Sequence, residues 1–174
     1  MLEYNNKLSE IVDHCISNAK KKGATEVEVG IVRSTAETVS YRNKKLEESD
    51  RSENIGLSLT AYINKKKNSV LSSNLKTDNL EKLIERCVEA AKITPEDESN
   101  SLPDKELFFE NSDELDLFDE THLENNQKID YLKEAEEVAF KNKEIVNTNG
   151  SSFSESKTEV VLGNSKGFRN GYKT

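Results

Sequence analysis

The chain has 174 residues, of which 33% are hydrophobic and 33% are charged, and its formal net charge is −8. This length fits one domain or two very small ones, and the acidic balance argues against direct binding of nucleic acid, whose phosphates favour clustered Lys and Arg. No apolar stretch approaches the roughly 20 residues that span a membrane, and the first residues lack the basic-then-apolar pattern of a secretion signal. We therefore expect a cytoplasmic protein.

A helix is predicted at the start of the chain, because apolar residues recur at the spacing of one helix face. These residues are Leu8, Ile11, Val12, Cys15 and Ala19. Gly23 follows a run of three lysines and is a plausible residue to end the helix.

Four strands are predicted next. Residues 26–31 alternate between polar and apolar side chains, residues 38–46 form a second candidate, and residues 55–63 alternate most clearly. A polar turn at residues 64–68 then leads into a short strand at residues 69–72. The short connections favour an antiparallel meander.

A second amphipathic helix follows, with Asp78 and Glu81 spaced as in a capping box and an end near Thr94–Pro95. The segment from Thr94 to His122 is strongly acidic, but it also contains interspersed Leu and Phe residues. A disordered tether would lack such aromatics. We interpret it as a long loop pinned to the domain by its apolar side chains.

A third helix is predicted at roughly residues 124–141, and two strands at residues 145–148 and 157–162 close the chain. The apolar face of this helix would contain Ile129, Leu132, Ala135 and Ala139. Because the strands are grouped rather than alternating with helices, the fold class is α+β: an antiparallel meander sheet with about three packing helices and a C-terminal strand pair.

The residues by themselves reveal no catalytic chemistry. The two histidines, His14 and His122, belong to no CxxC, HExxH or similar ligand set. Cys15 and Cys87 lie on apolar helix stripes and are interpreted as core thiols, with a structural disulfide as the alternative. No G-x-S-x-G elbow accompanies the many serines. We therefore assign no catalytic, cofactor-binding or metal-binding residue.

Two glycine-containing segments near the end of the chain nevertheless carry a resemblance. They are Ile145-x-Asn147-Thr148-x-Gly150-x-Ser152-Phe153 and Gly163-Asn164-Ser165-x-Gly167. The second lacks the Walker pattern of a phosphate loop and has the composition of a tight turn. Together with residues 23–27, 93–97, 102–104 and 115–118, taken in order, these segments resemble the TldD/PmbA family. Members of this family have been called modulators of DNA gyrase and are treated as metallopeptidases.

The resemblance is closest to the PmbA (TldE) branch and carries specific implications. Residues 1–174 would form the N-terminal domain, with the acidic loop at about residues 94–122, and the family's C-terminal domain would lie outside them. Zinc is expected not in this chain but in a TldD-type partner subunit, through a His-Glu-x-x-x-His motif. The two homologous subunits would enclose a chamber in which unfolded or leader peptides are cleaved, without direct contact to nucleic acid or membrane.

A second hypothesis belongs to a different functional class. The chain could act as a non-enzymatic interaction module that binds a protein such as gyrase or an antitoxin. Its acidic loop would then offer a negative surface to a basic partner.

Overall fold

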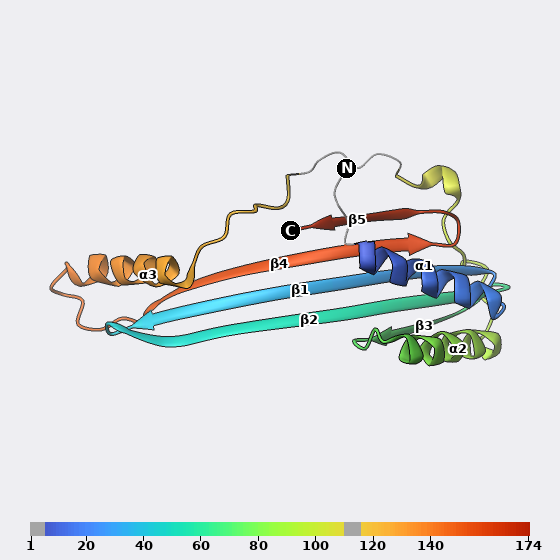
Figure 1. The fold of residues 1–174 in the computed structure, drawn as a ribbon, viewed down its shortest axis with the longest axis horizontal. Coiled ribbons are helices and arrows are strands. Elements are labelled where there is room, and N and C mark those ends of the chain that lie inside the picture. The colour runs from blue at the N-terminus through green and yellow to red at the C-terminus, as the bar shows by residue number, and fades with distance from the viewer. Residues whose placement is uncertain (1–5, 110–115) are drawn as a thin grey trace. The chain divides into compact units, whose positions relative to one another are not determined.

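The computed structural model describes residues 6–109 and 116–174, which form a five-stranded antiparallel sheet and three α-helices (Figure 1). The strand order is β3-β2-β1-β4-β5. The strands are β1 (Glu26–Arg42), β2 (Lys45–Ile63), β3 (Lys66–Ser72), β4 (Ser151–Asn164) and β5 (Arg169–Lys173). The helices are α1 (Asn6–Lys21), α2 (Thr77–Ile93), the short 3-10 helix η1 (Lys105–Leu107) and α3 (Asn125–Phe140). The predicted α+β class is confirmed.

The chain divides into two compact units. The first comprises residues 1–33, 54–117 and 158–173, and the second comprises residues 34–53 and 118–157, together with residue 174. Strands β1, β2 and β4 contribute residues to both units.

The core of the first unit lies between α1, α2 and the sheet. The buried side chains include the predicted stripe of α1 and its counterpart on α2, and they meet the inward-facing residues of β1 and β2. Among the most buried are Val12, Val29, Leu59, Ile84 and Cys87. Both cysteines are buried and free, which confirms the core interpretation and excludes the disulfide.

Helix α1 ends as its sequence predicts. Gly23 has a φ of 105°, a left-handed conformation that glycine adopts without strain. Its N–H donates to the carbonyl of Lys20 and the N–H of Ala24 donates to the carbonyl of Ala19, both at 3.0 Å. This pair of bonds is a Schellman motif, and it satisfies carbonyls that the helix would otherwise leave unpaired.

The predicted strands at residues 26–31 and 38–46 are wrong as separate elements, because β1 runs continuously from Glu26 to Arg42. The intervening residues contain no Gly or Pro and include Val32 and Thr35, whose branched side chains favour extended backbone. The hairpin turn lies instead at Asn43 and Lys44, whose φ values of 49° and 62° are those of a two-residue turn.

Other local predictions are also wrong. Strand β3 begins at Lys66, inside the predicted turn at residues 64–68, because Asn64 and Lys65 alone make the turn, and β5 was not predicted. Residues 145–148 form no strand: the Asn147 side chain accepts the N–H of Thr148, and the Thr148 hydroxyl accepts the N–H of Gly150, so local bonds replace a ladder. Helix α2 begins after Lys76 without a side-chain cap from Asp78. The capping box lies instead at α3, between Glu124 and Gln127.

The part of the acidic loop that belongs to the first unit is held there by a polar clamp as well as by the apolar contacts that the sequence predicts. Leu102 is buried, and its N–H donates to a Glu26 carboxylate oxygen at 2.7 Å. The Lys166 ammonium donates to the carbonyls of Leu102 and Pro103 at 2.9 and 3.0 Å, and lies 3.1 Å from the other Glu26 oxygen. Leu107 and Phe109 are exposed, and Leu115 lies outside the described residues.

Candidate functional site

The most distinctive cluster of the second unit is a buried lysine held by two carboxylates. Lys128 on α3 is 1% exposed, and its ammonium lies 3.0 Å from Glu37 Oε2 on β1 and 2.9 Å from Glu155 Oε1 on β4. The same ammonium lies 5.8 Å from the centroid of the Phe153 ring, within the range of a cation–π contact. Three separate elements therefore converge on one positive charge.

Electrostatics keep this lysine charged. Burial disfavours the ammonium, but the hydrogen bonds to Glu155 and Glu37 outweigh that cost and raise the pKa of Lys128 above its ordinary value. The hydrogen bond from Lys128 correspondingly lowers the pKa of Glu37. A lysine whose charged form is favoured cannot serve as a nucleophile near neutral pH, since that role needs the free amine. The cluster is therefore suited to fixing α3 on the sheet rather than to covalent catalysis.

A second buried charge of α3 organises the β1–β2 turn. Glu136 is 4% exposed, and its two carboxylate oxygens accept the N–H groups of Asn43 at 2.7 Å and Lys44 at 2.9 Å. The turn leaves these N–H groups without partners in the strand ladder, and the carboxylate satisfies both. The prediction that Ala135 faces inward is wrong, because Ala135 is exposed and Glu136 takes the buried position.

Neither charged position was predicted from the sequence, although a signal for them existed. Lys128, Leu132 and Glu136 recur every four residues and so lie on one helix stripe. We assigned that stripe by hydrophobicity alone, which places a lysine and a glutamate in solvent. Only the facing groups Glu37, Glu155 and the turn amides make their burial favourable.

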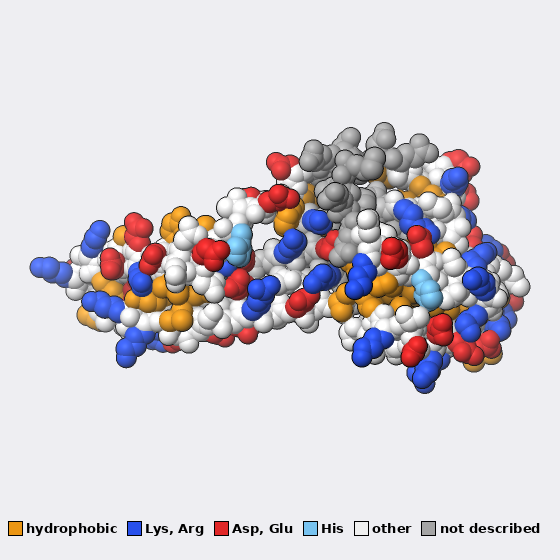
Figure 2. Space-filling model, viewed as in Figure 1, with side chains coloured by type: hydrophobic (Ala, Val, Ile, Leu, Met, Phe, Trp, Pro, Cys, Tyr) orange, Lys and Arg blue, Asp and Glu red, His pale blue; other side chains and the backbone are white. Residues whose placement is uncertain are grey.

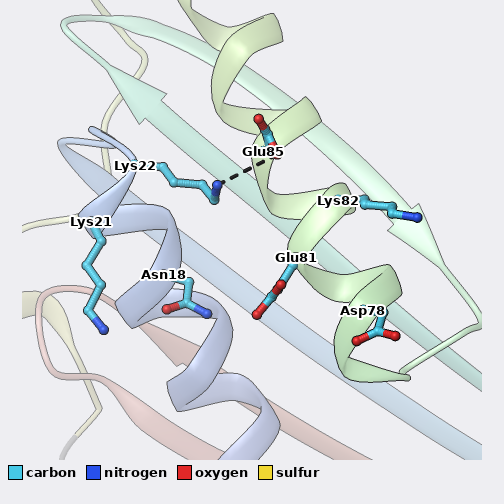
Figure 3. Close-up of a pocket in the computed structure, with 7 residues that line it drawn as sticks. All are labelled: Asn18, Lys21, Lys22, Asp78, Glu81, Lys82 and Glu85. Atoms are coloured by element: carbon cyan, nitrogen blue, oxygen red, sulfur yellow. Dashed lines mark ion pairs between the residues drawn. The ribbon is translucent and has the colours of Figure 1, made fainter.

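A polar pocket lies between α1 and α2 of the first unit, with a volume of about 620 Å³ (Figure 3). Its lining combines positive and negative side chains with one neutral amide: Asn18, Lys21, Lys22, Asp78, Glu81, Lys82 and Glu85. Lys22 reaches across to Glu85 at 3.7 Å, and Glu81 extends from α2 toward Asn18 of α1. Because its charged side chains are exposed and of mixed sign, the pocket can offer polar contacts but concentrates no single charge.

A smaller apolar pocket of about 290 Å³ lies where the acidic loop meets the end of β4. Its walls include Leu102, Leu107, Phe108, Leu162 and Phe168. The Phe108 and Phe168 rings pack with centroids 5.4 Å apart, which anchors the loop beside the β4–β5 turn. The lining also includes Glu28 and Asn164, and the apolar part of this surface could receive an apolar side chain of a peptide.

The histidines and cysteines take structural positions. His14 Nε2 lies 3.0 Å from the Asn18 amide nitrogen one turn along α1, and His122 Nδ1 lies 3.7 Å from Glu155. Burial raises the pKa of the Cys15 thiol to about 11, so it stays protonated and inert near neutral pH. Within residues 6–109 and 116–174, no three His, Cys, Asp or Glu side chains are grouped to hold a metal ion.

The segment from Gly163 to Gly167 covers the end of β4 and most of the turn to β5, which lies at residues 165–168, and its composition indicates such a turn. The Asn164 side chain is buried and accepts the N–H groups of Lys166 at 2.9 Å and Phe168 at 3.2 Å. Ser165 bonds to β1 twice, through its N–H to the carbonyl of Val27 and through its hydroxyl from the N–H of Val27. These groups are used within the fold, which leaves the turn no phosphate-binding role.

The charges on the surface are mixed as well. Lys and Arg side chains are interspersed with Asp and Glu over the face shown in Figure 2. No helix within the described residues is long and apolar enough to cross a bilayer.

Comparison with known proteins gives two consecutive domain matches. The first domain of the PmbA/TldA metallopeptidases matches residues 27–91, and the central domain of the same family matches residues 118–174.

Three curated relatives agree with these matches. "Metalloprotease PmbA" of Escherichia coli O157:H7 is 29% identical over 90% of this chain and 34% of its own length. PmbA homologues of Haemophilus influenzae and Buchnera aphidicola are 26% and 33% identical over 95% and 85% of this chain. These alignments cover 37% and 33% of the two homologues, so the chain spans about a third of the length of the curated relatives it matches.

Solved structures show the same fold. A candidate modulator of DNA gyrase from Bacteroides thetaiotaomicron matches 98% of this chain with a TM-score of 0.86 at 22% identity, over 39% of its own chain. TldE from Thermococcus kodakarensis matches 94% of this chain with a TM-score of 0.74 at 16% identity, over 36% of its own chain. The sequence matches lead to one conclusion: the chain belongs to the PmbA/TldD family of metallopeptidases, is of its PmbA (TldE) type, and matches the first and central domains of that family.

Proposed function

We propose that this chain is the N-terminal part of the non-catalytic subunit of a zinc-dependent peptidase that acts in the cytoplasm. A homologous TldD-type subunit supplies the zinc, which polarises the scissile carbonyl and activates water. The chain described here helps to wall the substrate chamber and limits which unfolded or leader peptides enter it. The observation that carries the proposal is the ordered match to two successive domains of the PmbA/TldA metallopeptidases.

Two features of the chain fit this role. The charged side chains with the deepest burial are engaged in structural contacts, Lys128 with two glutamates and Glu136 with a turn. The apolar pocket beside the acidic loop offers a surface that suits side chains of an unfolded peptide. Both features support guiding a substrate rather than cleaving it.

The test is reconstitution with a TldD-type subunit from the same organism. The gene product containing this chain and the TldD-type subunit are purified separately, and cleavage of a quenched fluorescent, unstructured peptide is followed with each alone and with both. We expect zinc-dependent cleavage only from the mixture. Cleavage should disappear on chelation, and on Glu→Gln substitution in the partner's His-Glu-x-x-x-His motif.

The alternatives give different results. Zinc-dependent cleavage by the product of this gene alone would contradict the non-catalytic assignment. If the two proteins neither associate nor affect one another's activity, the interaction-module hypothesis gains. In that case pull-down against gyrase and antitoxin proteins becomes the deciding measurement.

A further inference from the structure

The outer edge of β2 is open over about half of its length. On that side of β2 the neighbouring strand is β3, which pairs with Leu57–Ile63. Every residue from 45 to 54 is exposed. Among the described residues, the pairing between β2 and β3 does not include any of them. The part belonging to the second unit, residues 45–53, is about 30 Å of strand edge. Edges of this kind can pair with another strand.

The other long strand is situated differently. Strand β5 pairs with residues 159–163 of β4. The part of β4 before these residues has side-chain partners from the segment that precedes α3. The Lys157 ammonium lies 4.8 Å from the Phe118 ring centroid, and Glu155 lies 3.7 Å from His122. Two charged side chains within residues 45–53 of β2 interact with the neighbouring strand β1: Glu47 lies 3.9 Å from Arg42, and Arg51 acts electrostatically on Glu37. These interactions are with β1, on the other side of β2 from its outer edge, so that edge is the stronger candidate for an external partner.

The sequence of this edge is self-complementary in charge. If two copies pair antiparallel about a two-fold axis at Ser49, Lys45 faces Glu53 of the second copy and Glu47 faces its Arg51, and the symmetry repeats both pairs. Placing the axis at residue 48 or 50 instead sets Glu48 or Asp50 against itself. Opposite charges directly across an antiparallel pair are favourable, and like charges are unfavourable.

We propose that a second copy of this chain pairs edge to edge with β2 over Lys45–Glu53, with Ser49 on the two-fold axis. The contact is isologous, as in most homodimers, and goes beyond the proposed role as a peptidase subunit. On the opposite face of the strand, Glu48 meets Asp50 of the second copy. The dimer therefore has four favourable charge pairs and two unfavourable ones, which gives it salt-dependent, moderate affinity.

Cysteine cross-linking tests the register. Directly opposed residues of an antiparallel pair have Cα atoms about 5 Å apart, within disulfide reach. Ser49→Cys should form a disulfide-linked dimer under mild oxidation. Ser52→Cys is the matched control, because residue 52 faces residue 46 and its own copy lies about 20 Å away. The native cysteines are buried and will not interfere. Equal cross-linking of the two variants, or none for Ser49→Cys, would overturn the proposal.

Charge reversal tests the recognition. Glu47→Arg or Arg51→Glu alone turns two attractive pairs into repulsive ones, and sedimentation equilibrium should show dimerisation weakened by about tenfold or more. The double variant recreates both pairs with exchanged signs and should recover wild-type affinity within about threefold. All variants change exposed side chains, and circular dichroism verifies that they fold. A wild-type chain that stays monomeric at high concentration, or a double variant without recovery, would refute the register.

Discussion

At the scale of single residues, the protein places charge where a hydrophobic core is expected. Lys128 and Glu136 are buried on either side of Leu132, and each is stabilised by groups from another element. Burying a charge is costly unless it is paired and hydrogen-bonded. The position of α3 is therefore determined by a small set of directional contacts as well as by its few apolar side chains.

Replacing Lys128 should destabilise the second unit. Lys128→Met removes the cation and leaves Glu37 and Glu155 facing each other. We therefore expect a loss of about 2–3 kcal/mol in the free energy of unfolding. This value is at the lower end for a buried ion pair, because the Glu155 side chain is 34% exposed and solvent screens its charge. Urea unfolding followed by circular dichroism measures it. Lys133→Met on the same helix, which removes an exposed pair with Asp130, is the control and should change little. Equal effects of the two substitutions would show that the buried cluster is not stabilising.

The stability that this cluster provides should depend on pH at both extremes. The folded pKa of Glu37 is below its ordinary 4.5, so its contribution is complete above about pH 4.5 and is lost as pH falls through the lowered value. The folded pKa of Lys128 is above its ordinary 10.5, so its contribution is complete below about pH 10.5 and is lost as pH rises through the raised value. The stability difference between wild type and Lys128→Met should therefore be flat between about pH 5 and 10 and shrink outside that window in urea titrations. A difference that changes steadily across neutral pH would contradict this assignment.

At the scale of elements, close approach of backbone decides what packs together. A Cβ at Gly163 of β4 would lie 2.6 Å from Val12 Cγ1 of α1 and 3.0 Å from Arg169 Cδ. Arg169 is long and could move, but Val12 is fully buried in the first core. The glycine therefore permits the contact between α1 and the end of β4.

Gly163→Ala should cost about 1–3 kcal/mol in the free energy of unfolding, because the added methyl overpacks a buried contact. Gly56→Ala in β2 is the matched control, since a Cβ there meets nothing within 4 Å. The control should leave stability unchanged or slightly higher. Chemical denaturation of both variants makes the comparison, and a harmless Gly163→Ala would mean that α1 can shift freely.

At the scale of the whole molecule, the two units differ greatly in their apolar cores. The first is built from two helices and the buried halves of β1 and β2. Among the described residues of the second, the apolar cluster has three buried members, Val39, Tyr41 and Leu132, with Ile129 and Phe153 packed beside them. A small core gives less free energy to oppose local opening.

Amide hydrogen exchange should reveal this difference within one strand. In β1, residues 38–42 belong to the second unit and residues 27–31 to the first. We expect the amides of residues 38–42 to exchange at least about tenfold faster, measured by NMR or by mass spectrometry of overlapping peptides. Uniform protection along β1 would show instead that the sheet opens only as a whole.

The sequence predicted well those parts that depend on local pattern. The stripe of α1, its stop at Gly23, the bounds of α3 and the turn after Gly163 each follow from periodicity or from residues with strong backbone preferences. The family also followed from ordered short segments, and the domain matches confirm it. By contrast, the division of residues 26–46 into two strands was wrong. The residues between the two predicted strands contain no Gly or Pro to interrupt a strand, and such an absence is a weaker signal than the presence of one of these residues.

The sequence by itself determined the α+β class, the order of most helices and strands, and the family. The first two rest on interactions between near neighbours in the chain, and the family rests on short segments taken in order. Only the tertiary structure decided that Lys128 and Glu136 are buried, that Lys166 clamps the acidic loop and that half of the β2 edge is open. Each of these depends on groups distant along the chain: Glu37 and Glu155 for Lys128, the β1–β2 turn for Glu136, and the seven-residue length of β3 for the edge. A charge is stable in the interior only beside its partner, and no local pattern records which partner the fold will bring.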